Sequence, residues 1–201
     1  MPPTKSSKKV TLHLATSDEA NALLAGDPFA LLVGMLLDQQ YPMEAAFSSP
    51  HLIAQRLGTD RLDPAYLAKL DPEELVTLAK GPPAIHRYPG SMAERIQKVA
   101  QHVVDEYGGD TAALWTGAAD GAELFARLKA LPGFGEQKAK IFTALLGKQL
   151  GVTPSGWREA AAAYGDEGST RSVADVTGPE SLAAVRAFKQ EQKAKAKAAN
   201  A

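Results

Sequence analysis

A glycine-rich turn in the second half of the chain has the residue types of an anion-binding site. Residues 131–142 read LPGFGEQKAKIF, and glycines at 133 and 135 permit backbone torsions closed to other residues. A helix that begins directly after Gly135 leaves its first N–H groups without intrahelical partners, so they can bind a phosphodiester oxygen. An ordinary αα-hairpin with glycine at its corner is the alternative. The residues predicted to bind phosphate are Gly133, Phe134, Gly135, Lys138 and Lys140.

A second group of polar residues follows the most apolar stretch of the chain. Asp38, Gln39 and Gln40 come directly after the run FALLVGMLL. Buried polar groups need hydrogen-bond partners, so these side chains are candidates to line a cleft. A helix C-terminal turn that faces water explains them equally well.

The amino-acid composition excludes several kinds of catalytic and metal site. The 201 residues include no cysteine, which excludes a thiolate nucleophile, a disulfide framework and Cys-ligated zinc or iron–sulfur sites. The four histidines are scattered without metal-ligand spacing, so we expect neither a metal nor a cofactor. No apolar run approaches the roughly 20 residues needed to cross a bilayer, and no signal-peptide stretch follows the charged start. A cytoplasmic protein without membrane contact is expected.

The net charge of −1 conceals an uneven distribution. Residues 1–9 carry a charge of +3, residues 10–126 carry −9, and residues 127–201 carry +5. Charge asymmetry of this kind is typical of proteins with a polyanion partner. Solvated helix faces and a flexible tail are an equally good explanation.

The elements that must position these groups are helical nearly throughout, and the fold class predicted is all-α. Asp-Pro pairs at 27–28, 63–64 and 71–72 each provide an N-cap acceptor followed by proline at the first helical position. Ser91 and Glu94 have the spacing of a capping box. No segment of strand length shows a period of two.

The order of these motifs resembles one family. Residues 131–142 resemble the helix–hairpin–helix of the endonuclease III-like DNA glycosylases, in which a Gly/Pro-rich loop precedes a catalytic Asp. Residues 27–40 resemble that family's early helix, whose final Gln fills the gap left by an extruded base; Gln40 matches it. Residues 89–104 resemble the helix before the hairpin. The resemblance covers about residues 20–150.

The resemblance implies two helical lobes with a DNA-facing cleft between them. The Lys/Ala-rich end of the chain has almost no apolar face, so we expect a frayed helix or disorder there, with some non-specific affinity for DNA. The expected units are a basic flexible N-terminus (1–9), a six-helix lobe (21–149) with the helix–hairpin–helix at 122–150, a second helical lobe (10–20 with 150–186) and a basic tail (187–201).

Two positions depart from the family's pattern. Members that also cut the strand have a Schiff-base Lys where this chain has Gln137, and the adjacent Lys138 should be turned away by about 100°. The family's catalytic Asp falls about twenty residues past the same glycine, near Ser155, where no acid occurs. Asp166 or Asp175 can take that role if the loop is longer; otherwise both are loop-solvating or N-cap carboxylates.

The leading hypothesis is a monomeric base-excision DNA glycosylase that acts on double-stranded DNA in the cytoplasm, at the nucleoid, without a lyase step. The alternatives are a non-catalytic DNA-binding protein that has lost the Asp and, more weakly, a structural helical protein. The predicted catalytic residues are Asp175 and Asp166. The predicted gap-filling and cleft residues are Gln40, Gln39, Asp38 and Gln137.

Overall fold

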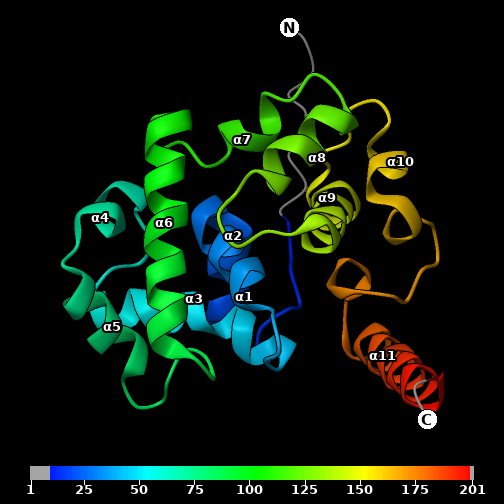
Figure 1. Cartoon of the computed structure of the whole chain (residues 1–201), viewed down its shortest axis with the longest axis horizontal. Coiled ribbons are helices and arrows are strands. Elements are labelled where there is room, and N and C mark those ends of the chain that lie inside the picture. The colour runs from blue at the N-terminus through cyan, green and yellow to red at the C-terminus, as the bar shows by residue number, and fades with distance from the viewer. Residues whose placement is uncertain (1–9, 200–201) are drawn as a thin grey trace, which may run out of the picture.

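The computed structural model describes residues 10–199, and its regular structure there is entirely helical, which confirms the all-α prediction (Figure 1). The helices are α1 (Asp18–Gly26), α2 (Pro28–Leu37), α3 (Met43–Leu57), α4 (Pro64–Lys69), α5 (Pro72–Lys80), α6 (Pro89–Tyr107), α7 (Ala113–Thr116), α8 (Gly121–Lys129), α9 (Glu136–Leu150), α10 (Trp157–Ala161), η1 (Ala162–Tyr164), η2 (Val173–Asp175) and α11 (Pro179–Ala199). The predicted N-terminal segment 1–9 lies outside the described residues. Within them no single helix is long and apolar enough to cross a membrane, although the bent pair of α1 and α2 meets the length and composition criteria together.

Local capping explains where several helices begin. Asp27, Asp63 and Asp71 are the N-caps of α2, α4 and α5, and each side chain accepts backbone N–H groups of the first turn, which confirms the Asp-Pro predictions. The capping box predicted at Ser91 and Glu94 is wrong. Helix α6 begins two residues earlier, at a proline that suits the first helical position, so both residues lie inside the helix.

Helix α2 is the centre of the core. Every residue of it after Pro28 is buried, as expected for a helix that is apolar all round. It packs against α1 and α3, while α6 packs against α4 and α5. Because α2 ends at Leu37, the polar residues that follow emerge at a fixed place where the core meets the surface.

The second half of the chain is organised around α9. Helices α8 and α9, joined by a short turn, form the predicted helix–hairpin–helix, and α9 also packs against α10 and η2. Among the elements, α11 packs closely only against η2, and it stands apart from the other helices at the lower right of Figure 1.

The structure adds detail to two segments of the predicted organisation. Residues 10–20 are predicted to join 150–186, yet the N–H groups of Leu14 and Thr16 donate to Asn21 in α1 and Ser48 in α3. The division into lobes with those bounds stays a prediction. Where the sequence predicts a frayed or disordered end from residue 187, α11 continues to Ala199.

Candidate functional site

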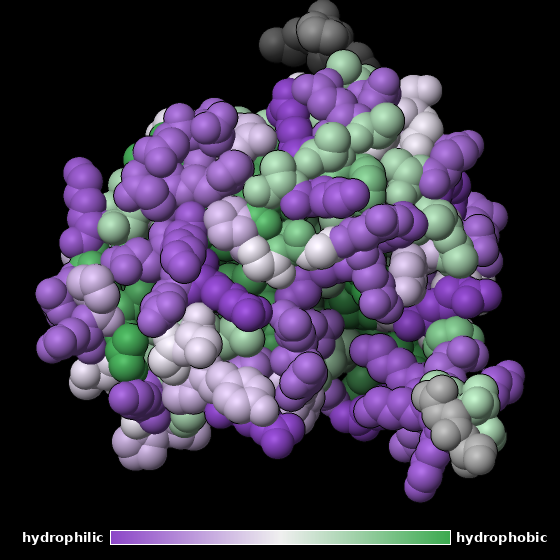
Figure 2. All heavy atoms as spheres, in the orientation of Figure 1, coloured by the Kyte–Doolittle hydropathy of each residue, from purple (hydrophilic) through white to green (hydrophobic). Residues whose placement is uncertain are grey.

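A cleft of about 1460 Å³ opens between the end of α2, the hairpin before α9 and one side of α11. In the space-filling view the surface is hollowed beside α11, with apolar side chains in the hollow and polar ones around it (Figure 2). Asp38, Gln39, Gln40 and Gln137 all line this cleft. The structure therefore brings together residues that lie about a hundred positions apart in the sequence.

The cleft is cationic although the chain as a whole is nearly neutral. Six basic and two acidic side chains line it, whereas the net charge of the chain is −1. A cleft lined mainly by one sign of charge raises the local concentration of an oppositely charged partner. The charged lining residues are Arg87, Lys138, Arg171, Arg186, Lys189, Lys193, Asp38 and Glu44.

The turn after α2 is held by a buried histidine. The N–H of Tyr88 donates to Nδ1 of His86 at 3.0 Å, so the proton lies on Nε2, which donates to the carbonyl of Gln39 at 3.0 Å. Burial lowers the pKa of His86 and keeps the ring neutral, as this arrangement requires. Arg95 donates to the side-chain oxygen of Gln39 at 3.2 Å. Both ends of Gln39 are thus fixed.

Gln40 is presented to the cleft from this clamped turn. Its φ of 53° is left-handed, a conformation that is uncommon for residues other than glycine and is stable only when the surroundings enforce it. The residue is exposed and lines the cleft. Sequence reasoning selected Gln40 by its position, but the clamp by His86 and Arg95 is a tertiary arrangement that no local pattern reveals.

The two glycines of the hairpin differ in what they require. Gly133 has φ of 80°, and a Cβ there would lie 3.0 Å from a methyl of Leu36 in α2, so this position needs glycine. Gly135 has φ of −87° and ψ of 177°, open to any residue, and a Cβ there would meet nothing within 4 Å. The predicted need for special torsions is right for Gly133 and wrong for Gly135. Instead, Gly135 leaves open space in front of α9.

The N-terminus of α9 is available to an anion. Gly135 is its N-cap, and no side chain in the described part of the chain caps it. The first intrahelical bond runs from the N–H of Ala139 to the carbonyl of Gly135, so the N–H groups before Ala139 point out of the helix end. The backbone geometry there is the one that the anion-site prediction requires.

Two of the predicted phosphate-binding residues are engaged elsewhere. The N–H of Phe134 donates to the carbonyl of Leu131 at 3.0 Å, and its ring is buried 6.2 Å from that of Phe142. Phe134 therefore packs as a plug between the hairpin helices, and its N–H is already bonded within the turn. Lys140 pairs with Glu136 at 2.6 Å and lies outside the cleft lining.

Gln137 and Lys138 both line the cleft, so the expected 100° turn does not carry Lys138 away from it. Gln137 donates to the hydroxyl of Tyr164 at 3.0 Å. The Nζ of Lys138 donates to the carbonyl of Leu36 at 2.7 Å and lies 5.5 Å from the ring centre of Phe134. Lys138 is thus a half-buried cation that ties α9 to α2, and not a solvated charge.

Burial acts on Lys138 and Asp38 in opposite directions. Burial lowers the pKa of Lys138 from 10.5 to about 8, opposed by the negative charge of Asp38. It raises the pKa of Asp38, opposed by Lys189 and Lys138. Each group therefore favours the charged form of the other in a setting that disfavours both charges.

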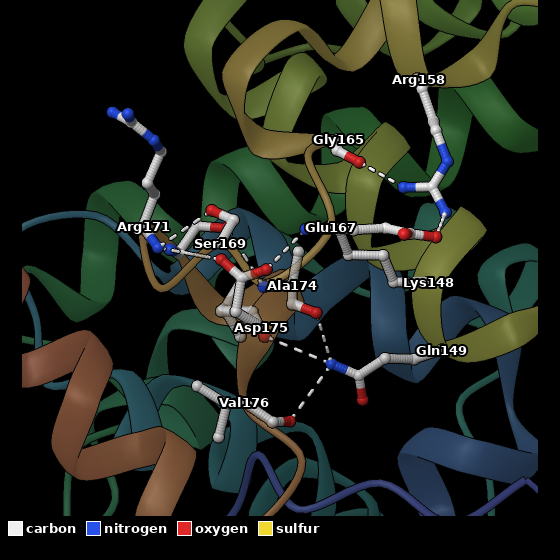
Figure 3. A network of polar contacts seen from close by, with 12 residues as sticks. Lys148, Gln149, Arg158, Gly165, Glu167, Ser169, Arg171, Ala174, Asp175 and Val176 are labelled. Atoms are coloured by element: carbon white, nitrogen blue, oxygen red, sulfur yellow. Dashed lines mark hydrogen bonds and ion pairs between the residues drawn. The ribbon is translucent and has the colours of Figure 1, made fainter.

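The two acids predicted to be catalytic lie outside the cleft lining. Asp175 accepts from Nζ of Lys148 at 2.6 Å and from the N–H groups of Arg171 and Ser172 at 2.9 and 3.2 Å (Figure 3). It completes a capping box with Ser172 and ties η2 to α9, while the guanidinium of Arg171 points away from this network. Asp166 is exposed. The structure therefore does not bring either acid to the cleft.

The acids that do line the cleft are Asp38 and Glu44. Glu44 pairs with Arg186 of α11, whereas the described residues provide no ion pair within 4 Å for Asp38. Elsewhere in residues 10–199 there is no group of three His, Cys, Asp or Glu side chains placed to hold a metal ion. Asp38 is the carboxylate that sequence reasoning assigned to the cleft without assigning it any chemistry.

A family model described as the HhH-GPD superfamily of base excision DNA repair proteins matches residues 33–200. This chain belongs to that superfamily. The match includes every residue that lines the cleft, and it shows a DNA-binding protein of base excision repair. Comparisons with curated proteins and with solved structures found no match.

Proposed function

We propose that this HhH-GPD protein is a monomeric DNA glycosylase that acts on double-stranded DNA. It hydrolyses the N-glycosidic bond of a damaged or mispaired base and leaves the strand intact. The observation that carries the proposal is Asp38, a desolvated carboxylate in a cationic cleft beside a family-type hairpin.

Each wall of the cleft has a part in positioning the DNA. The open N-terminus of α9 at Gly135 anchors one phosphate without reading sequence. The target nucleotide turns out of the duplex into the cleft, because its glycosidic bond is inaccessible within the stack. Gln40, held on its clamped turn, fills the gap that the base leaves.

Asp38 supports the bond cleavage. As the bond between C1′ and the base breaks, positive charge develops on the sugar, and a carboxylate beside it stabilises that charge and orients the water that attacks C1′. The water oxygen bonds to C1′, and its proton goes by way of the solvent to the departing base. Lys189 and Lys138 favour the ionised form of Asp38, because their positive charges oppose the rise in its pKa that burial causes.

Base release from a panel of lesion-bearing duplexes, under single-turnover conditions, tests the proposal. Asp38→Asn should lower the rate on the responsive lesion by about 10²–10⁴-fold. Asp166→Asn is the matched control, because it makes the same change on an exposed acid outside the cleft, and it should leave the rate unchanged. A wild-type rate for Asp38→Asn would refute the role of Asp38.

One observation favours the non-catalytic alternative. Both acids predicted to be catalytic are outside the cleft, and the carboxylate of Asp175 already accepts three hydrogen bonds. If wild-type protein binds duplex DNA but releases no base from any duplex in the panel, that alternative replaces the glycosylase.

Borohydride reduction on abasic-site DNA tests the absence of a lyase step. Gln137 cannot form a Schiff base, and Lys138, with a pKa of about 8, is mostly protonated at neutral pH and hydrogen-bonded to Leu36. We expect no covalent adduct. An adduct that disappears in Lys138→Arg but persists in Lys140→Arg would make Lys138 a nucleophile.

A further inference from the structure

Helix α11 has far less packing than its length requires. Of its 21 residues only Val185 is buried, and residues 190–199 are all exposed. Its first half is anchored by Val185, by the guanidinium of Arg171 lying 5.3 Å from the ring centre of Phe188, and by the ion pair of Arg186 with Glu44. Because most helical stability in proteins comes from packing, a ten-residue extension whose residues are all exposed contributes little to the fold.

The charges of α11 are segregated by face. Arg186, Lys189, Lys193 and Lys197 follow one another at intervals of three, four and four residues, which places them on one face of the helix. The first three of these line the cleft. The acids of α11 lie on the opposite face, where Glu191 pairs with a lysine four residues later at 2.6 Å.

We infer that these four residues, the α11 stripe, form a second DNA-contact surface that holds the sugar–phosphate backbone across the cleft from α9. The inference rests on the proposed function only in placing DNA in the cleft. The stripe extends over about 16 Å at 1.5 Å per residue. Duplex DNA has one phosphate charge for about every 1.7 Å of its axis, so each cation has a phosphate within reach.

The chemistry of the stripe favours nucleic acid over an anionic membrane. A helix that lies on a bilayer needs a broad apolar face with large side chains to bury. Beyond Phe188, the apolar residues of the described part of α11 are all alanines. The stripe offers charge without an apolar surface to insert, which is the pattern of phosphate contacts that position a duplex.

The salt dependence of DNA binding tests the inference. The variant is the triple substitution Lys189→Gln/Lys193→Gln/Lys197→Gln. Glutamine has nearly the same helix propensity as lysine, so α11 should remain helical, and circular dichroism checks this. Each phosphate contact contributes about 0.9 to the slope of log K against log salt. We expect the slope for an undamaged duplex to fall by roughly two to three, with about a 100-fold weaker Kd near 0.15 M salt.

A charge-matched control is available on helices that lie away from α11. Lys69→Gln/Lys80→Gln/Lys98→Gln removes the same charge from exposed positions on α4, α5 and α6, outside the cleft lining. It should change the slope by less than about one, since it alters only the overall field. Equal slopes for the two triple variants would overturn the inference, as would absence of duplex binding by the wild type.

Two further outcomes separate this inference from the proposed function. A wild type that releases no base, yet binds DNA with a slope that depends on the stripe, leaves the inference standing and removes the glycosylase. Stripe-dependent binding to phosphatidylserine vesicles that exceeds binding to duplex DNA would assign the stripe to membranes instead. Arg186 is left unchanged throughout, because its removal would leave Glu44 without its partner.

Discussion

The region around η2 and the region at the end of α2 each contain one aspartate, and the two are used differently. Asp175 has a side chain that is only 5% exposed, and its oxygens accept from an ammonium and two backbone N–H groups. Asp38 is also desolvated, but its surroundings raise its pKa, and it faces an open cleft with Lys138 beside it.

The difference shows where a carboxylate is free to act. The hydrogen bonds of Asp175 hold η2 on α9, so its carboxylate already has partners within the folded protein. The charge of Asp38 is costly in the free protein, and a cationic sugar in the cleft would compensate for it. Strained or destabilised groups of this kind are concentrated at functional sites because their cost is recovered on binding.

The largest expected effect is on stability, and it should separate the two aspartates. Asp175→Asn leaves the largely buried Lys148 without its partner, so the free energy of unfolding should fall by about 3 kcal/mol. Asp38→Asn removes a desolvated charge and should cost no stability. Urea unfolding at pH 7 measures both. A greater loss for Asp38→Asn would reverse the comparison.

Lys138→Met should make the protein more stable at pH 7. The fall of the pKa of Lys138 from 10.5 to about 8 corresponds to about 3 kcal/mol. Loss of its hydrogen bond to Leu36 costs about 1 kcal/mol, so the free energy of unfolding should rise by about 2 kcal/mol in total. Base release should fall, because Asp38 loses its supporting charge.

The stability gained by Lys138→Met should depend on pH, with a definite sign. Between pH 8 and 10.5 the unfolded chain binds more protons at Lys138 than the folded chain, so wild-type stability rises with pH through this site. The advantage of Lys138→Met should therefore shrink between pH 8 and 10.5. An advantage that stays constant over this interval would mean that Lys138 is not desolvated.

The two hairpin glycines should separate folding from binding. Gly133→Ala places a Cβ at a left-handed φ against Leu36, which should cost about 1–2 kcal/mol of stability. Gly135→Ala should leave stability within about 0.5 kcal/mol. It should weaken duplex binding roughly tenfold, because its Cβ would occupy the open space in front of α9 and keep a phosphate from one charge-assisted hydrogen bond. Thermal unfolding and fluorescence anisotropy measure the two effects. Unchanged affinity in Gly135→Ala would remove the α9 anion site.

The smallest expected effect is on the pH profile of base release. Asp38 must be ionised, and its raised pKa places the acid limb above the ordinary value of 3.8. The rate should also halve near pH 8 as Lys138 loses its proton, and Lys138→Met should abolish that alkaline limb. An acid limb centred at or below 3.8 would contradict desolvation of Asp38.

Local features of this chain were predictable from sequence, and tertiary ones were not. The Asp-Pro caps, the left-handed Gly133 and the hairpin follow from near neighbours in the chain, so their patterns identified them. The reach of Lys138 to the carbonyl of Leu36 spans 102 positions, and no periodicity encodes it. Chain spacing and apolar neighbours favour Asp175 as the catalytic acid, but neither can reveal that Lys148 already pairs with it.

A crystal structure with a duplex that contains a cationic pyrrolidine analogue of the abasic sugar tests the central claim most directly. The analogue mimics the positive charge that develops on the sugar during bond cleavage. We predict a carboxylate oxygen of Asp38 within hydrogen-bond distance of the ring nitrogen, with the Lys148 pair of Asp175 intact. A ring nitrogen bound to Asp175, with η2 displaced into the cleft, would contradict it.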